Sequence, residues 1–131
     1  MVTDTIGDFI NRLTTATAVR KATVTMPFSK LKHQIALVLK REGYLGEISE
    51  SKGEVGKTLT VELIYDPDGE PRIHGAKRLS KPGRRLYAPV HTIHPIKNGK
   101  GCLVLTTPRG IMTDKDARRD RVGGETMFTI W

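Results

Sequence analysis

The segment from Leu59 to Tyr65 constrains the fold of this 131-residue chain more than any other. Its apolar side chains fall at every second position: Leu59, Val61, Leu63 and Tyr65. This period of two is typical of a β-strand with one buried face, and the turn signal Asp66-Pro67-Asp68-Gly69 follows it directly. Such a strand requires a neighbouring strand for its backbone and an apolar layer for its buried face, so the segments around it must supply both.

Two segments upstream repeat apolar residues at the helical period instead. Their stripes comprise Ile6, Phe9, Ile10 and Leu13, and then Leu31, Ile35, Val38 and Leu39. Thr5 and Ser29 are the predicted N-caps, and Gly43 is expected to end the second helix. With short strands predicted at 23–26 and 44–48, the N-terminal part has the order helix, strand, helix, strand, strand.

Short strands and turns dominate the rest of the chain. The apolar run from Cys102 to Leu105 predicts one strand, and residues 126–131 predict another. Between them, Thr113 is the predicted N-cap of a short charged helix, with Asp116 at the capping-box spacing. The pair Gly123-Gly124 is expected to end that helix.

These patterns predict an α+β fold of two small lobes, an N-terminal α-β-α-β-β sandwich at residues 1–70 and a mainly β lobe with a short helix at 71–131. The charge divides at the same place, since the net charge of +8 is the sum of -1 for residues 1–70 and +9 for residues 71–131. Between Glu70 and Asp114 there are nine basic residues and no acidic one. Such segregation is typical of a protein that binds a polyanion, with an inert basic surface as the alternative. We favour nucleic acid as the partner.

No pattern predicts catalysis, a cofactor or a metal site. Gly56-Lys57-Thr58 imitates the end of a phosphate-binding loop, but Ser51 stands where that loop needs glycine, and a strand follows where it needs a helix. His91 and His94 have no Cys, Asp or Glu near them in sequence to complete a metal site. The single cysteine, Cys102, falls in an apolar strand, where a thiol behaves as a small hydrophobe. We therefore predict a protein that is not an enzyme and has no cofactor, catalytic residue or bound metal.

The chain also lacks the marks of a membrane or secreted protein. Its longest apolar run, Ile35 to Leu39, is far shorter than the ~20 residues of a membrane span. Asp4 and Asp8 occupy the N-terminal region where a secretory signal would be apolar. We expect a soluble, intracellular protein.

The segment from Thr106 to Gly110 is the strongest candidate for contact with nucleic acid. It presents two hydroxyls, an arginine and a glycine on a tight turn, although an ordinary surface loop is the alternative. Hydroxyls can bond to base edges and sugars, whereas Arg109 and the basic cluster from Lys77 to Arg85 can hold phosphate. Further arginines follow at positions 118, 119 and 121.

Several segments occur in an order that is specific to one protein family. They are Ser29-Lys30-Leu31-Lys32, Leu39-Lys40-Arg41-Glu42-Gly43-Tyr44, Arg78-Leu79-Ser80-Lys81-Pro82-Gly83, Leu86-Tyr87, Gly110-Ile111-Met112-Thr113-Asp114, Ala117-Arg118 and Gly123-Gly124-Glu125. Together they closely resemble the eighth small-subunit ribosomal protein of bacteria (S-eight, the universal uS-eight family), from about Thr3 to Trp131.

The resemblance implies a structural constituent of the small ribosomal subunit, located in the cytoplasm within the ribosome. Such a protein binds the central domain of small-subunit ribosomal RNA directly, mainly through its C-terminal lobe, and helps its assembly. Neighbouring small-subunit ribosomal proteins are further expected partners, with no membrane and no small-molecule substrate. A basic DNA- or RNA-binding regulator outside the ribosome is the alternative. A DNA-binding regulator would need a recognition helix, and the predicted helix at 114–121 is short and half acidic.

The predicted RNA-binding residues combine hydroxyls, cations, one aromatic ring, close-approach glycines and one carboxylate. They are Ser29, Lys30, Lys32, Lys81, Arg84, Arg85, Tyr87, Thr106, Thr107, Arg109, Gly110, Gly124 and Glu125. Because phosphate repels a carboxylate, Glu125 is expected to accept specific hydrogen bonds from an exocyclic amine or a 2′-hydroxyl.

Two positions depart from the pattern of the family. Its turn usually has Ser-Thr-Ser where this chain has Thr106-Thr107-Pro108, and Pro108 offers neither a hydroxyl nor an amide donor. Its first helix commonly has Arg-Asn where this chain has Thr14-Thr15. We expect one RNA contact to be missing at the turn and a weaker contact from the helix.

Overall fold

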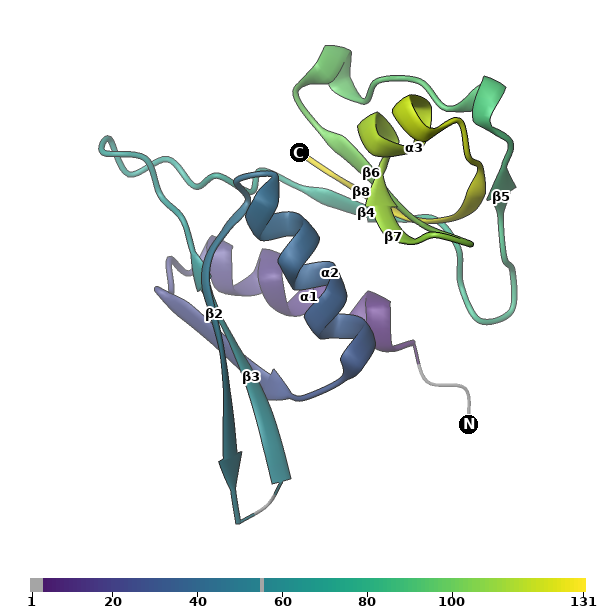
Figure 1. The fold of residues 1–131 in the computed structure, drawn as a ribbon. Helices are drawn as coiled ribbons and strands as arrows, with labels where there is room; N and C mark the ends of the chain where they lie inside the picture. Colours follow the sequence, from purple (N-terminus) through teal and green to yellow (C-terminus); the bar gives the residue numbers. More distant parts are fainter. Residues whose placement is uncertain (1–3, 55) are drawn as a thin grey trace. The chain divides into compact units, whose positions relative to one another are not determined.

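The computed structural model describes residues 4–54 and 56–131, and the chain forms two compact units (Figure 1). One unit is Phe9–His74, and the other combines the segment up to Asp8 with Gly75–Trp131. The predicted α+β class is confirmed, with an α/β N-terminal region and a mainly β C-terminal region that carries one α-helix. Among the described residues, no helix is both long and apolar enough to cross a membrane.

The first unit is built on a three-stranded antiparallel sheet. Its elements are α1 (Thr5–Ala18) from Phe9 onward, β1 (Thr23–Pro27), α2 (Lys30–Arg41), β2 (Leu45–Gly53) and β3 (Gly56–Leu63). The strand order β1-β3-β2 makes the predicted alternating strand, β3, the central one. Its side chains at 59, 61 and 63 are buried, as the period of two predicted. The buried stripes of the two helices supply the remaining core side chains, which include Phe9, Leu13, Ile35 and Leu39.

The N-cap predicted for α1 is wrong by one residue. Asp4, not Thr5, performs this role, since its Oδ1 accepts a hydrogen bond from the backbone N–H of Gly7 at 3.0 Å. The same carboxylate accepts two hydrogen bonds from the guanidinium of Arg78, at 2.9 and 3.2 Å. Partial burial opposes the charged form, but the hydrogen bonds from Arg78 and Gly7 outweigh it and lower the pKa of Asp4.

The second unit is built around one long strand. Its elements are β4 (Ala76–Arg78), β5 (Tyr87–Ala88), the 3-10 turns η1 (Val90–Thr92) and η2 (Lys97–Gly99), β6 (Cys102–Thr107), β7 (Gly110–Thr113), α3 (Asp114–Asp120) and β8 (Gly124–Ile130). The strand order is β4-β8-β6-β7, and β5 also pairs with β8. The strand β8 therefore holds β4 and β5 along one edge and β6 along the other.

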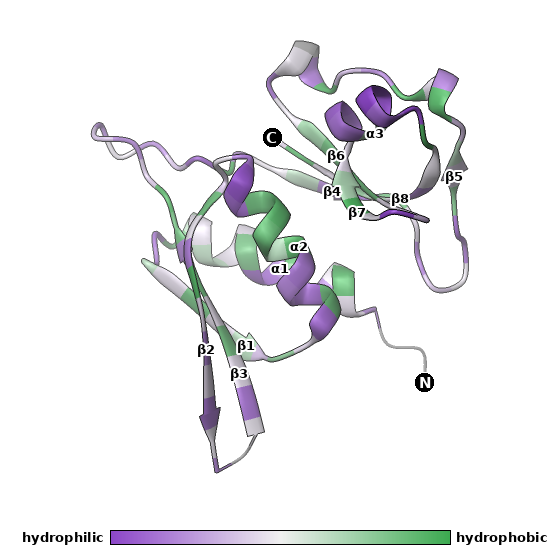
Figure 2. Cartoon of the chain, in the orientation of Figure 1, coloured by the Kyte–Doolittle hydropathy of each residue, from purple (hydrophilic) through white to green (hydrophobic). Residues whose placement is uncertain are grey.

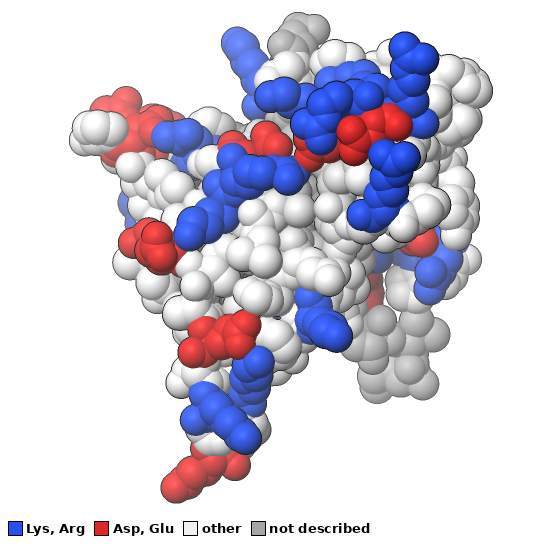
Figure 3. All heavy atoms as spheres, in the orientation of Figure 1, with Lys and Arg blue, Asp and Glu red and all other residues white. Residues whose placement is uncertain are grey.

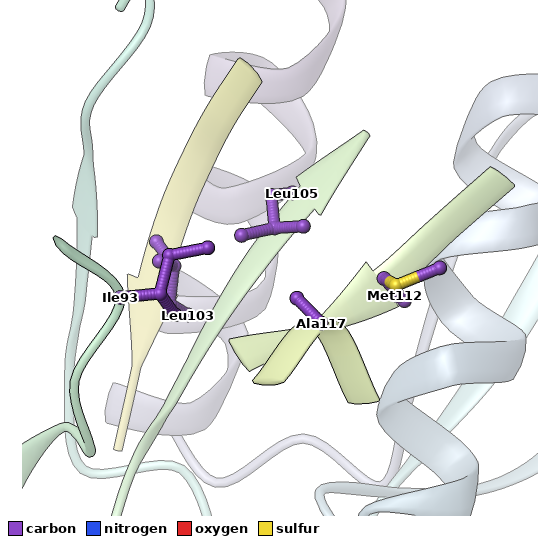
Figure 4. Close-up of a cluster of buried hydrophobic side chains, with 5 residues drawn as sticks. All are labelled: Ile93, Leu103, Leu105, Met112 and Ala117. Carbon is purple, nitrogen blue, oxygen red and sulfur yellow. The ribbon is translucent and has the colours of Figure 1, made fainter. Parts of the chain in front are cut away.

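The core of the second unit lies between α3 and the sheet. Figure 4 shows five buried side chains of this cluster: Ile93, Leu103, Leu105, Met112 and Ala117. The helix α3 is polar over most of its surface (Figure 2), and Ala117 is its apolar contribution to this cluster. A helix this short is stabilised by packing rather than by intrinsic propensity.

The start of α3 agrees with prediction, whereas its end does not. The hydroxyl of Thr113 accepts a hydrogen bond from the backbone N–H of Asp116 at 3.4 Å, as the capping-box spacing predicted. The helix ends at Arg121, which adopts the left-handed conformation with φ of 54°. The prediction that Gly123-Gly124 ends the helix is therefore wrong.

Candidate nucleic-acid interface

Three strands place Thr106, Glu125 and Tyr87 in one row across the sheet of the second unit. Thr106 on β6 is directly opposite Glu125 on β8, and Glu125 is directly opposite Tyr87 on β5. Directly opposed residues of antiparallel strands project to the same face of a sheet. We call these three residues the ladder row. It combines a hydroxyl, a carboxylate and a phenol ring that is 72% exposed.

A β-bulge and a glycine determine which residues enter the ladder row. The pairing of β6 with β8 shifts by one residue between Val104 and Leu105. Without that shift Thr106 would oppose Thr126, and Glu125 would project to the other face. A Cβ atom on Gly124 would lie 2.2 Å from the carbonyl oxygen of Thr106, so only glycine permits this approach of the two strands.

The turn between β6 and β7 engages the hydroxyl of Thr107 internally. Thr107 Oγ1 donates to the carbonyl of Gly110 at 2.9 Å and accepts from the backbone N–H of Arg109 at 3.1 Å. Pro108 and Arg109 are the two turn residues, and Gly110 adopts a φ of 114° that favours glycine. The hydroxyl of Thr107 thus stabilises the turn and retains only one acceptor lone pair for another partner. Thr106 makes no side-chain hydrogen bond to another residue that the structure describes, which leaves it the better placed of the two for a ligand.

A closed loop presents the basic side chains that precede β5. Lys81 and Arg84 exchange backbone hydrogen bonds of 2.9 Å across the turn Pro82-Gly83. The loop is anchored at its base by Ser80, which is 1% exposed and whose hydroxyl bonds to both the N–H and the C=O of Leu86. The loop therefore has a defined backbone from which exposed cations project. We call Lys81, Arg84 and Arg85 the basic loop.

The basic loop and the ladder row meet at one ion pair. Arg85 Nη1 lies 3.4 Å from Glu125 Oε1, and the two side chains are 63% and 16% exposed. A pair this exposed contributes little stability. Its effect is local, because the guanidinium offsets the negative charge that would otherwise repel phosphate from this face.

Three arginines of the candidate basic segments, Arg78, Arg118 and Arg119, have internal partners. Arg118 lies 2.7 Å from Asp114, which is 3% exposed and also accepts from the backbone N–H of Leu103. Arg119 pairs with Asp116 at 3.2 Å and with Asp120 at 3.1 Å, and the hydrogen bond that its guanidinium donates to Asp120 raises the pKa of Arg119. Figure 3 shows basic and acidic side chains interleaved over α3. Arg78 in β4 is likewise occupied, by Asp4 and by the carbonyl of Met127.

The three remaining candidates, Ser29, Lys30 and Lys32, belong to the first unit. Ser29 caps α2 as predicted, since its hydroxyl accepts from the backbone N–H of Lys32 at 3.4 Å. Lys30 is exposed at the helix start, but Lys32 is 6% exposed. Of the two lysines predicted to bind RNA, only Lys30 is therefore exposed in this chain.

Sequence patterns identified most of these residues but did not predict which of them contact one another. The partners Asp4–Arg78 and Arg85–Glu125 are separated by 74 and 40 residues, so no local signal could have paired them. The Ser80 anchor was visible only as part of a family motif. Among the residues that the structure describes, no group of three His, Cys, Asp or Glu could hold a metal ion.

Comparison with known proteins shows that the chain is similar to ribosomal proteins. The model of the family described as "Ribosomal protein S8" matches residues 4–131. The chain is 43% identical over 130 residues to the small ribosomal subunit protein uS8 of Arthrobacter sp. (strain FB24), covering 99% of this chain and 98% of that protein. It is 42% identical to the proteins of the same name from Chloroflexus aurantiacus and Bifidobacterium longum subsp. infantis, over 131 and 130 residues and with the same coverage.

The chain therefore belongs to the ribosomal protein S8 family of the small ribosomal subunit. Members of this family are structural proteins and not enzymes, as the sequence predicted. The coverage leaves no large segment of these relatives unmatched.

Proposed function

We propose that this protein is a structural constituent of the small ribosomal subunit that binds the central domain of small-subunit ribosomal RNA directly and helps its assembly. The region 71–131 makes the main contact, through the ladder row and the basic loop. The region 1–70 adds a second RNA surface at the start of α2. Neighbouring small-subunit proteins are its other partners.

The ladder row is the observation that carries this proposal. Thr106 offers a donor and an acceptor, Glu125 offers acceptors alone, and the ring of Tyr87 offers a flat apolar surface for a base. Sequence-specific recognition of RNA uses such groups on bases that are unstacked or distorted, because the major groove of A-form RNA is too narrow for side chains. The row suits an irregular RNA segment better than a uniform duplex.

The basic loop supports the same proposal by supplying phosphate contacts beside the row. Its three cations are exposed, and the described segment between Glu70 and Asp114 carries no acid to oppose them. Phosphate contacts position a protein without reading sequence, whereas the row discriminates between bases. The basic loop therefore supplies affinity for RNA in general, and the ladder row supplies specificity for one RNA.

The alternative of a DNA-binding regulator finds less support. The candidate recognition helix of the basic region is α3, which has 7 residues and whose arginines at 118 and 119 pair with acids of the same helix. A major-groove helix needs such side chains to reach base edges.

Footprinting of the full chain on purified small-subunit ribosomal RNA tests the proposal. We expect protection confined to one irregular segment of the central domain. Glu125→Gln should weaken that protection while leaving binding to random RNA undiminished, because the variant removes a discriminating acceptor and releases Arg85. Glu54→Gln, at an exposed position of the first unit, is the matched control. Protection spread evenly along the RNA, or an equal loss for both variants, would contradict the proposal.

A further inference from the structure

The outer edge of β1 is an open strand edge within the described chain. The sheet order gives β1 a single neighbouring strand, β3. Backbone hydrogen bonds to β3 at Ala22 and Phe28, both 2.9 Å, flank β1 on either side. Because alternate residues of an antiparallel strand bond to the same neighbour, the even-numbered residues face β3. The backbone N–H and C=O groups of Thr23 and Thr25 therefore point away from the sheet.

Pro27 confirms this orientation and limits the length of the open edge. It occupies the next outward-facing position, where a strand tolerates a residue without an N–H group. The open edge thus offers alternating donors and acceptors at Thr23 and Thr25 and ends at Pro27. An edge this short avoids uncontrolled pairing between sheets but can still accept a short strand.

A groove of about 300 Å³ runs beside this edge, along α1. Ala16 of α1 and Val19, just after the end of that helix, are among its lining residues, and Val19 is 63% exposed, which is unusual among the described aliphatic side chains. Arg12 and Lys21 line it as well, and no described lining residue is acidic. The groove therefore has an apolar side chain and two cations beside the unpaired backbone edge of β1.

We propose that this groove binds an extended acidic segment of another protein, which adds to the sheet as a strand beside β1. The backbone of the segment would bond to Thr23 and Thr25. One apolar side chain would contact Val19, and carboxylates would lie near Arg12 and Lys21. Strand addition to an open edge beside a helix is a general mode of peptide recognition, with affinity from main-chain bonds and specificity from the groove.

Two other occupants fit the groove less well. A phosphate backbone could accept from the outward N–H groups, but the carbonyls of Thr23 and Thr25 on the same edge would repel it. A second copy of the chain would bring Arg12 and Lys21 of one groove against the same cations of the other. An acidic polypeptide satisfies both the ladder and the charge.

Amide chemical shifts of the full chain provide the test. The probe is a blocked heptapeptide that alternates valine with aspartate or glutamate, and the control peptide has lysine at every acidic position. We expect the acidic peptide to shift the amide signals of Thr23 and Thr25 at up to millimolar concentration, and the basic peptide to leave them unchanged.

Two pairs of variants locate the binding. Thr25→Pro removes the outward N–H, whereas Thr25→Val retains it, and both remove the hydroxyl that bonds to Thr60 Oγ1 at 3.0 Å. We expect Thr25→Pro to bind the acidic peptide at least about tenfold more weakly than Thr25→Val, the equivalent of one lost hydrogen bond. Should Thr25→Pro fail to fold, Val19→Glu tests the groove, with Leu37→Glu, at an exposed aliphatic side chain of α2, as its control.

Every other outcome overturns the proposal. Equal binding of the acidic and the basic peptide would exclude an acidic segment as the specific partner. Stronger shifts of the same amides by a short RNA oligonucleotide would make the groove an RNA site. Amide shifts that depend on protein concentration alone would make the groove a contact between copies of the chain. The absence of any amide shift with every probe would show that the groove does not bind a strand.

Discussion

Thr106 and Thr107 are adjacent in sequence, but their hydroxyl groups have different surroundings. Thr107 bonds within the turn that follows β6, whereas Thr106 lies in the ladder row beside Glu125. On the sequence alone, both hydroxyls are equivalent candidates for RNA. The structure assigns the Thr107 hydroxyl mainly to stability, and our proposal assigns the Thr106 hydroxyl to recognition.

Valine substitution at each position separates these two effects. We expect Thr106→Val to cost about 1–3 kcal/mol of affinity for cognate RNA, the usual penalty for an unpaired polar partner, with little effect on random RNA. Thr107→Val should instead lower the free energy of unfolding by about 1 kcal/mol, because two turn hydrogen bonds are lost. Urea unfolding and paired binding assays measure the two effects, and identical profiles for the two variants would contradict the assignment.

The lowered pKa of Asp4 makes the stability of the second unit depend on pH. A carboxyl whose folded pKa lies below its unfolded value, near 3.8, stabilises the fold above that value and loses this contribution as the pH falls through the folded pKa. We expect Asp4→Asn, which keeps a capping oxygen, to lower the urea midpoint at neutral pH. The difference from wild type should shrink below about pH 4. In an Arg78→Gln background the same substitution should have a much smaller effect, and an unchanged effect would exclude the ion pair as the cause.

At the scale of elements, the start of α2 separates two lysines that the family motif presents together. Lys30 is exposed, whereas Lys32 is buried within the chain. We expect Lys30→Gln to change the free energy of unfolding by less than about 0.5 kcal/mol and to reduce incorporation into reconstituted small subunits. Lys32→Gln should destabilise the protein itself by about 1 kcal/mol or more, through lost packing of its stem. Normal incorporation of Lys30→Gln would exclude this helix start from the RNA contact.

The elements themselves were predictable where one face is buried and the chain is regular. The alternation at Leu59, Val61 and Leu63 predicted β3 because each of these side chains is in the core. The end of α3 was not predictable, since Arg121 adopts a conformation in which glycine is the expected residue. The ladder row was not predictable as a row. It depends on a one-residue bulge at Met127 in β8, and no local pattern encodes the register between strands about 20 residues apart.

At the scale of the whole molecule, the charge is concentrated in one region of the sequence but not on every element of it. The arginines at 118 and 119 of α3 are balanced by acids of the same helix, which leaves the basic loop and Arg109, in the turn after β6, as exposed cations near the ladder row. Net charge alone therefore overstates the surface available to phosphate.

Neutralising Arg84 and Arg85 together tests this distribution. We expect the double Gln variant to weaken binding to cognate and random RNA alike, because phosphate contacts are independent of sequence. The slope of log affinity against log salt should fall by about 2, roughly one for each contact removed. A double Gln variant at Lys40 and Lys52, exposed lysines of the first unit, should leave the slope nearly unchanged. A fall of the same size in both variants would show that only total charge matters.

The central position of β8 has a consequence for the order in which the protein acquires its properties. Its neighbours β4, β5 and β6 are all synthesised before it, and none of them can complete the sheet until it has emerged. The strands of the first unit, by contrast, are contiguous and can assemble while translation continues. A nascent chain that has not reached Gly124 carries the cations of the basic loop but neither Glu125 nor the strand that aligns Thr106 with Tyr87. On the proposed function, an interrupted product would adhere to RNA without choosing among RNAs, and discrimination would be the last property that synthesis confers.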